Sequence, residues 1–266
     1  MRGPASTHGP PAGPPPDRAA NAEPTPHVIP FRARTGTRGA DAGSHKANPP
    51  TGVPDEALPM PEGVMFTCRR VAPGQALYLE GDQVRFLYEV RQGSFKTVLL
   101  LRDGRDQVTR FPMAGDLLGL DGVGRDAHAS SAVALEDSEV RAIPIDGVHR
   151  QLQSPEWRDA LCRVMGQEIV RESRHMLVLG SAGTEARVAM FLLELSEHLR
   201  SRGYSAREFH MRMTRAEIGS YLGLTLETVS RTLSAFQQRG VLHVQKRHIT
   251  IESLDALRRI EREDGP

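Results

Sequence analysis

The stretch from Thr214 to Gly240, TRAEIGSYLGLTLETVSRTLSAFQQRG, constrains the fold most strongly, because it contains two helical patterns around a Leu-Gly-Leu turn. Thr214 and Glu217 have the spacing of a capping box, which predicts the start of the first helix. Thr225 is a favourable N-cap for the second helix, and Gly240 is suited to end it. The segment therefore predicts two short helices joined by a tight turn at Gly223.

The second of these helices is predicted to have two chemically different sides. At about 100° of rotation per residue, its apolar side holds Val229, Leu233 and Phe236. The opposite side holds a polar row made of Glu227, Ser230, Arg231, Ser234 and Gln238. Two helices joined in this way form a helix-turn-helix, whose second helix enters the major groove of double-stranded DNA.

The first turns of the second helix carry side chains that suit the edges of bases. Arg231 can donate two hydrogen bonds to O6 and N7 of guanine, Glu227 can accept one from N4 of cytosine, and Ser230 can serve either kind of edge. The threonines expected at the DNA backbone are Thr214, Thr225 and Thr228. The alternative interpretation is an amphipathic surface helix whose charges are only solvated.

Two short apolar runs after the second helix predict a β-hairpin, or wing. They span Leu242–Val244 and Ile249–Ile251, and the QKRH tip between them carries Lys246 and Arg247, which are expected beside phosphates. The whole chain is nearly neutral, with 34 Lys and Arg against 33 Asp and Glu, but residues 205–251 hold seven basic and three acidic residues. Such an excess is typical of nucleic-acid modules and also occurs on solvated faces.

The rest of the chain divides by composition. Residues 1–60 hold 13 of the 19 prolines and are interpreted as a disordered Pro/Gly-rich tail, either an inert extension or a docking segment. Residues 61–150 contain short apolar runs between turn residues, which predicts a β-barrel or jelly roll. Residues 183–262 contain a further helix before the helix-turn-helix and its wing. The predicted fold class is α+β.

Residues 151–182 are predicted to form one long helix that begins near Pro155. Because its apolar positions cover more than one narrow stripe, we expect it to pack on its own domain and on a second copy of the chain; a core helix alone is the alternative. The expected dimer-helix positions are Leu161, Val164, Met165, Ile169, Glu172 and Met176. If Glu172 faces its twin, like-charge repulsion weakens the dimer; if it faces water, it has no such effect.

These motifs resemble the CRP/FNR superfamily of bacterial transcription regulators, and its FNR branch in particular. The likeness is strongest in MTRAEIGSYLGLTLETVSRTLSAFQQRGVLHVQKRHITI and extends to GDLLGLDGVG and ALEDSEVRAIP. It implies a homodimer with an N-terminal β-roll sensor, a long dimer helix and a C-terminal winged helix-turn-helix that works with RNA polymerase. It also implies that Glu227, Ser230 and Arg231 read a TTGAT-type inverted repeat, because they stand in the branch's E-T-x-S-R motif.

One departure from the resemblance concerns the [4Fe–4S] cluster of the FNR branch. That cluster needs four cysteines, whereas this chain has Cys68 and Cys162, and Arg141 stands at the internal ligand position. An iron–sulfur cluster is therefore not expected within one subunit. Cys68, beside Arg69 and Arg70, is either a possible redox sensor or an ordinary strand residue. Cys162 is expected to be packed among apolar neighbours.

A second departure concerns cyclic nucleotide. In the cAMP-binding members, a Glu follows a Gly and takes the ribose, and an Arg-Ser or Arg-Thr pair offers its guanidinium to the cyclic phosphate. The matching residues here are Leu120 after Gly119, and Ser130 with Ser131. We therefore expect no conventional cAMP binding and predict no cofactor. Three scattered histidines are either possible haem ligands or ordinary residues: His128, His149 and His175.

Other classes of protein leave no matching motif in the sequence. We find no nucleophile–base pair, HExxH or P-loop, so an enzyme is not expected. No apolar run approaches the roughly 20 residues of a membrane span, and the start of the chain has no signal-peptide core, which predicts a soluble cytoplasmic protein without a membrane partner. The alternative to a DNA-binding regulator is a small-molecule, haem or redox sensor whose C-terminal domain mainly contacts proteins.

Overall fold

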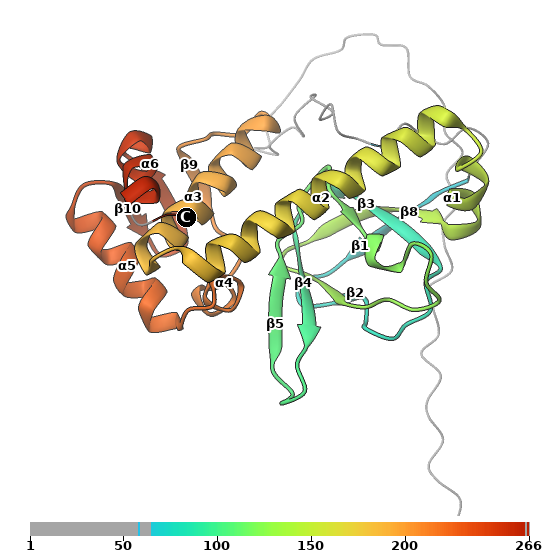
Figure 1. The fold of residues 1–266 in the computed structure, drawn as a ribbon, viewed down its shortest axis with the longest axis horizontal. Helices are drawn as coiled ribbons and strands as arrows, with labels where there is room; N and C mark the ends of the chain where they lie inside the picture. Colours follow the sequence, from blue (N-terminus) through green and yellow to red (C-terminus); the bar gives the residue numbers. More distant parts are fainter. Residues whose placement is uncertain (1–57, 59–64, 264, 266) are drawn as a thin grey trace, which may run out of the picture.

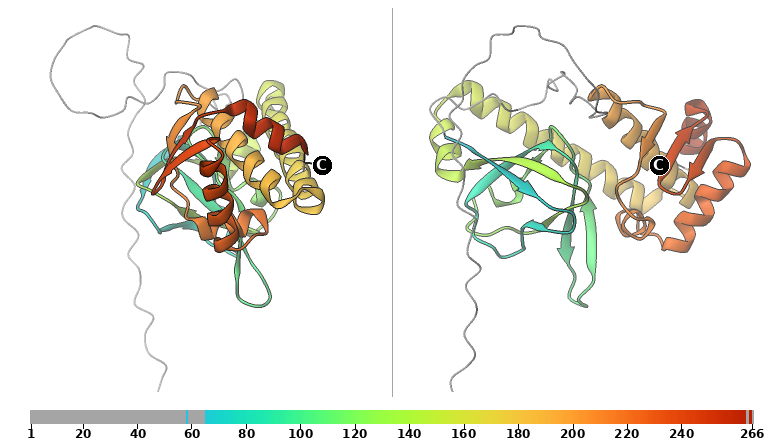
Figure 2. Two further views of the ribbon diagram at one scale, coloured as in Figure 1. Left: turned by 90° about the vertical axis from the view of Figure 1, so that its left-hand side faces the viewer. Right: turned by 180° about the vertical axis from the view of Figure 1, so that it is seen from behind.

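The computed structural model describes residues 58, 65–263 and 265. A β-roll comes first, and a long helix leads from it to a helical domain with a small sheet (Figure 1). Seen from behind, the β-roll lies along one part of the long helix and the C-terminal domain lies at its other end (Figure 2). The interpretation of residues 1–60 as a disordered tail concerns a segment that lies, apart from residue 58, outside the described residues.

The β-roll consists of two four-stranded antiparallel sheets, which confirms the jelly-roll prediction. One sheet has the order β1 (Thr67–Val71), β8 (Ser138–Pro144), β3 (Phe86–Gln92) and β6 (Leu117–Leu118). The other has the order β2 (Ala76–Tyr78), β7 (Ser131–Ala134), β4 (Phe95–Leu100) and β5 (Asp106–Arg110). Alternate residues of these strands point inward, so that Val90, Phe95 and Val140 are almost completely buried between the sheets.

A short helix that the sequence did not predict follows the β-roll. Strand β8 ends at Pro144, and Ile145 begins α1 (Ile145–Gln151). Pro144 stands at the N-cap, where its missing N–H costs no helical hydrogen bond. Ile143 at the end of β8 and Val148 in α1 are buried in the same cluster, so hydrophobicity alone does not separate strand from helix here.

The long helix, α2 (Pro155–Ser181), is present with Pro155 in its first turn. Its first half packs on its own β-roll, where Leu161 is buried in a cluster with Leu87 and Ile143, and Val164 and Met165 are partly buried against the same cluster. The expected dimer positions thus divide along the helix, and the early ones already have partners within the subunit.

The second half of α2 carries exposed apolar side chains. Ile169 is 63% exposed and Met176 is 65% exposed, and their neighbours Val170 and Leu177 are exposed as well. Ile169 and Met176 are seven residues apart, and so are Val170 and Leu177. Seven residues is the repeat of a coiled-coil seam. Glu172, between them, is also exposed.

Within the single chain, Cys162 is not packed among apolar neighbours as expected. Its side chain is exposed, because a rotation of about 100° from the inward-facing Leu161 turns it away from the β-roll. Cys162 lies seven residues before Ile169 and therefore on the same stripe of α2. Cys68 lies on β1, as expected, and is exposed.

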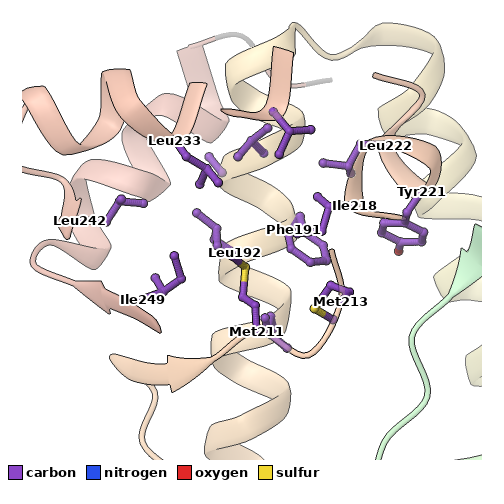
Figure 3. Packing of buried hydrophobic residues seen from close by; sticks show 14 of the residues in the cluster. Phe191, Leu192, Met211, Met213, Ile218, Tyr221, Leu222, Leu233, Leu242 and Ile249 are labelled. Carbon is purple, nitrogen blue, oxygen red and sulfur yellow. The ribbon is translucent and has the colours of Figure 1, made fainter. Parts of the chain in front are cut away.

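The C-terminal domain is built around α3 (Thr184–Ser201). It contains α4 (Arg215–Leu222), α5 (Leu226–Gln238) and a sheet of order β10 (Leu242–Gln245), β11 (His248–Ile251) and β9 (Glu208–His210), followed by α6 (Leu254–Glu263). Figure 3 shows Leu192 of α3 among the inward-facing side chains of α4, α5 and the sheet. The sequence predicted neither β9 nor α6, since each contributes a single well-buried apolar residue, Phe209 and Leu257.

A buried ion pair joins the β-roll to the C-terminal domain. Arg202, which follows α3, donates to Asp116 Oδ1 at 2.7 Å, and the backbone N–H of Met113 donates to Oδ2 at 2.9 Å. Burial would raise the pKa of Asp116, but its interaction with His198, followed by the charges of Arg110 and Arg202, outweighs that effect and holds the pKa well below its usual range. Asp116 is therefore charged at neutral pH and fixes the end of α3 to the β5–β6 connection.

Candidate nucleic-acid interface

The first helix of the pair, α4, begins with the capping box expected from its sequence. The hydroxyl of Thr214 accepts from the backbone N–H of Glu217 at 3.2 Å, and the Glu217 carboxylate accepts from the Thr214 N–H at 2.7 Å. The other oxygen of Glu217 accepts from Lys96 Nζ of β4 at 2.8 Å. Glu217 therefore caps the helix and also attaches it to the β-roll, a role of Lys96 that the sequence did not indicate.

A second attachment lies at the opposite end of α4. The Ser220 hydroxyl accepts from the backbone N–H of Val108 on β5 at 2.9 Å, and the Gln107 side-chain amide donates to the Ser220 carbonyl. Strand β5 is at the edge of its sheet, so its free backbone groups are available to the helix. The helix-turn-helix is thus docked on the β-roll through α4, which leaves α5 on the far side.

The turn between α4 and α5 depends on two glycines. Gly223 ends α4 with a φ of 64°, the left-handed conformation expected at this position. Gly219 was not singled out from the sequence, yet a Cβ there would lie 2.7 Å from the carbonyl oxygen of Leu224. The N–H of Leu224 donates back to the Gly219 carbonyl at 2.8 Å. The chain therefore returns across the face of α4 so closely that a side chain at residue 219 is excluded.

The recognition helix, α5, is oriented by its apolar side. Val229, Leu233 and Phe236 are almost completely buried against α3, α4 and the sheet, as the helical wheel predicted. Thr225 caps its start, since its hydroxyl accepts from the N–H of Thr228 at 3.1 Å. Its end is followed by Gly240 with a φ of 68°.

The polar row of α5 faces solvent. Glu227 and Arg231 are exposed and one helical turn apart, and Ser230 lies partly exposed between them. A hydrogen bond from its own backbone N–H, followed by contact with Thr225 and the charge of Arg231, holds the pKa of Glu227 below its usual range. The first turns of α5 thus present a carboxylate acceptor, a hydroxyl and a guanidinium donor together on one surface.

The wing follows with the register Leu242↔Ile251 to Gln245↔His248. Its tip turns at Lys246, which has a φ of 59° and is the only non-glycine residue with positive φ among the described residues. Lys246 and Arg247 are both exposed. One guanidinium N–H of Arg247 donates to the carbonyl of Arg212, between β9 and α4, at 3.3 Å, so this side chain is held against the neighbouring connection.

The three threonines expected at the DNA backbone all take part in helix caps. Thr214 also donates its hydroxyl proton to Glu217 at 2.9 Å. The hydroxyls of Thr225 and Thr228 lie 3.0 Å apart and share a hydrogen bond. Their contact with phosphates stays a prediction, and any such contact uses the hydrogen-bonding capacity that the caps leave.

The residues at the position of the FNR-branch cluster do not fit an iron–sulfur centre. Arg141 pairs with Glu89 at 2.8 Å, and its guanidinium lies 4.8 Å from the ring centroid of Phe66. Cys68 stands directly opposite Arg141 in the β1–β8 register. A guanidinium engaged with a carboxylate and a ring cannot take the place of a thiolate ligand.

The three histidines that the sequence singled out lie in different environments. His128 is buried and stacked on Tyr78, with ring centroids 3.8 Å apart; His175 on α2 is stacked on Tyr221 of α4 at 4.0 Å; His149 is exposed on α1. Burial lowers the pKa of His175. Within the part of the chain that the structure describes, no three His, Cys, Asp or Glu side chains form a group able to hold a metal ion.

Comparison with known proteins agrees with both halves of the fold. A cyclic nucleotide-binding domain model matches residues 68–154, and a Crp-like helix-turn-helix domain model matches residues 186–260. The fumarate and nitrate reduction regulatory protein of Salmonella typhimurium (strain LT2) is 42% identical over 188 residues, which cover 70% of this chain and 75% of that protein. This chain belongs to the CRP/FNR superfamily. The protein of the same name from Escherichia coli (strain K12) has the same identity and coverage.

Solved structures of other CRP/FNR proteins share the architecture. FixK2 from Bradyrhizobium japonicum superimposes with a TM-score of 0.70 at 30% identity, covering 74% of this chain and 98% of FixK2. A transcriptional regulator of the CRP family from Thermus thermophilus, TTHB099, has a TM-score of 0.60 at 23% identity, over 73% of this chain and 96% of that one, and supports the fold alone. As a CRP/FNR member, the protein is a DNA-binding transcription regulator, and these relatives are regulators rather than enzymes.

Among the residues that the structure describes, every helix is too short or too polar to cross a bilayer.

The close approach at Gly219 gives a direct test of the turn geometry. We expect Gly219→Ala to lower the free energy of unfolding by roughly 1–3 kcal/mol, because its Cβ meets a backbone oxygen that can move only with the whole turn. Ala216→Val, which adds carbon to the exposed side of the same helix, is the control and should have little effect. Urea denaturation of both variants measures the difference, and equal stability would contradict the geometry.

Proposed function

We propose that this regulator acts as a homodimer that recognises a TTGAT-type inverted repeat in double-stranded DNA. The observation that carries the proposal is the position of Arg231, exposed in the first turns of α5 on the same surface as Glu227 and Ser230. An exposed guanidinium at the start of a recognition helix can donate one hydrogen bond to O6 and a second to N7 of the same guanine. Glu227, ionised at neutral pH, is the matching acceptor for a cytosine N4 amine.

The wing supplies affinity in this proposal, and the recognition helix supplies sequence choice. Lys246 and Arg247 lie exposed at the tip of the wing. Contacts of such side chains with phosphates strengthen binding to any sequence and weaken steeply as salt rises. Salt dependence therefore separates DNA binding from the alternative function, a C-terminal domain that mainly contacts proteins.

The proposed dimer brings two recognition helices to one duplex. The exposed seam of α2, defined by Ile169, Val170, Met176 and Leu177, supports a parallel pair of α2 helices. Two-fold symmetry would then place the two α5 helices about one turn of DNA apart, roughly 34 Å, which matches an inverted repeat.

The signal and the transcriptional partner are further parts of the proposal. RNA polymerase is the partner that family membership implies. We infer that the β-roll uses neither a [4Fe–4S] cluster nor cAMP, because Arg141 is engaged with Glu89 and because Ser130 and Ser131 provide no guanidinium for a cyclic phosphate. Cys68 is exposed on β1, so a thiol-based signal is compatible with its position, and haem stays a weaker candidate.

The recognition proposal is tested by the affinity for a duplex that carries TTGAT-N4-ATCAA. Arg231→Ala should weaken this affinity by roughly 10- to 100-fold per half-site, since a bidentate arginine–guanine contact contributes about 1–3 kcal/mol of discrimination. Fluorescence anisotropy at fixed salt measures it. Binding of the scrambled duplex should hardly change, because α5 reads no bases there.

Arg258→Ala is the matched control for this measurement, since Arg258 is an exposed arginine on α6, where it pairs with Asp255. It should bind the repeat like the unmodified protein. If the unmodified protein bound the repeat and the scrambled duplex equally, the proposed site would be wrong.

The dimer proposal is tested by charging the seam of α2. Ile169→Glu combined with Met176→Glu should give a monomer at concentrations where the unmodified protein is a dimer, because each carboxylate would face its twin in an apolar seam. Light scattering coupled to size-exclusion chromatography measures the mass. Leu79→Glu, which charges another exposed leucine outside α2, should remain dimeric; a dimeric seam variant would refute the assignment.

A further inference from the structure

A tight hydrogen-bonding cradle lies in the β-roll, in the connection between β6 and β7. Three donors converge on Asp121 Oδ2: the backbone N–H of Ala129 at 2.9 Å, the backbone N–H of Ser130 at 2.9 Å and the Ser130 hydroxyl at 3.0 Å. Consecutive N–H groups that point at one oxygen are the usual arrangement of a small anion-binding site in protein backbone. Here the oxygen belongs to the chain itself.

The second oxygen of the same carboxylate faces His128. The Nδ1 atom of His128 lies 3.5 Å from Asp121 Oδ1. The imidazole is buried and held in place by the ring of Tyr78, whose centroid lies 3.8 Å away with the planes 12° apart. Tyr78 is in turn stacked on Tyr88 at 5.9 Å. The cradle is therefore fixed to the core of the β-roll by a column of three rings.

The backbone brings Asp121 to this site through a turn whose positive φ at Gly119 favours glycine. Gly119 has a φ of 88° and directs the chain into the 3₁₀ turn η1 (Leu120–Gly122), which carries Asp121. A Cβ on Gly119 would lie 3.3 Å from Cε1 of His128 and 3.4 Å from the carbonyl oxygen of Phe86. Gly119 therefore lies close against His128, the residue whose ring faces the Asp121 carboxylate.

The surroundings of Asp121 also favour the charged form of its carboxyl group. Burial would raise the pKa of Asp121, but hydrogen bonds from His128 and Ser130 outweigh burial and hold the pKa below its usual range. Asp121 is therefore an anion at neutral pH, although its side chain is only partly exposed to water.

We propose that the Ala129–Ser130 loop is an anion-binding site of the β-roll whose occupant is the chain's own Asp121 carboxylate, in place of a diffusible anion. The sensor domain is then assembled around an internal charge and holds its β6–β7 connection without a small-molecule ligand. This inference concerns the β-roll and does not depend on which DNA sequence the protein recognises.

The test removes the Asp121 carboxylate and supplies a small anion from solution in its place. The full-length Asp121→Ala variant leaves the two N–H groups and the hydroxyl without their acceptor, so its Tm should fall by roughly 5 °C. Sodium formate or inorganic phosphate, compared with sodium chloride at equal ionic strength, should restore at least half of that loss. The unmodified protein and Asp126→Ala, which removes an exposed carboxylate of the same connection, should show no such specific gain.

A second variant keeps the test decisive if Asp121→Ala does not fold in chloride. Asp121→Asn keeps the shape of the side chain and removes its charge, so it should fold with a lower Tm than the unmodified protein and should gain nothing from formate, because the amide still fills the cradle. The proposal is overturned if Asp121→Asn is as stable as the unmodified protein. It is equally overturned if formate and phosphate raise the Tm of Asp121→Ala no more than they raise the Tm of the Asp126→Ala control.

Discussion

Rotation of α5 about its own axis is set by the burial of Val229, Leu233 and Phe236 against α3 and α4. Each such side chain contributes about 1.5–3 kcal/mol when it leaves water, whereas an exposed charge on the opposite face contributes little to folding. The apolar side therefore decides which way the helix faces, and the polar row is left free to serve recognition. The caps and the turn at Gly223 only complete an orientation that this burial imposes.

Helix α2 is divided in a similar way, into a half that packs within the subunit and a half whose apolar side chains are exposed. Its first half packs on the β-roll through Leu161, while Ile169 and Met176 in the second half are exposed. The C-terminal domain is then tied to the β-roll by the Asp116–Arg202 ion pair and by the contacts of Glu217 and Ser220 on α4. The ion pair fixes the end of α3, and the other two contacts hold α4, the inner helix of the pair, so α5 and the wing remain accessible on the outer side of the molecule.

Local features of the fold followed from the sequence, and features that depend on distant neighbours did not. The capping box, the N-cap at Thr225 and the two faces of α5 are determined within a few residues, so spacing alone predicted them. Gly219 looked like an ordinary helical residue, because its constraint comes from the carbonyl of Leu224 after the turn. A helical Gly followed shortly by a second Gly was the only signal for it.

Other omissions have the same cause. Helix α6 contains mostly charged residues and becomes stable by resting Leu257 on α3, which the local pattern does not show. Cys162 was expected to be packed because its neighbours are apolar, but only the position of the β-roll decides which side of α2 is covered. Asp121 looked like one acid among many, since its donors are eight and nine residues further along the chain.

The contact between Arg231 and a base edge is the central claim, and it can be tested by altering one atom in each half-site of the DNA. Replacing the guanine of both TTGAT half-sites by 7-deazaguanine removes the N7 acceptor and leaves the base pair intact. The unmodified protein should lose roughly 10-fold or more in affinity, whereas Arg231→Ala should bind the two duplexes equally, because a charged hydrogen bond contributes about 1.5–3 kcal/mol. Equal binding of both duplexes by the unmodified protein, or the same loss in the variant, would contradict the account.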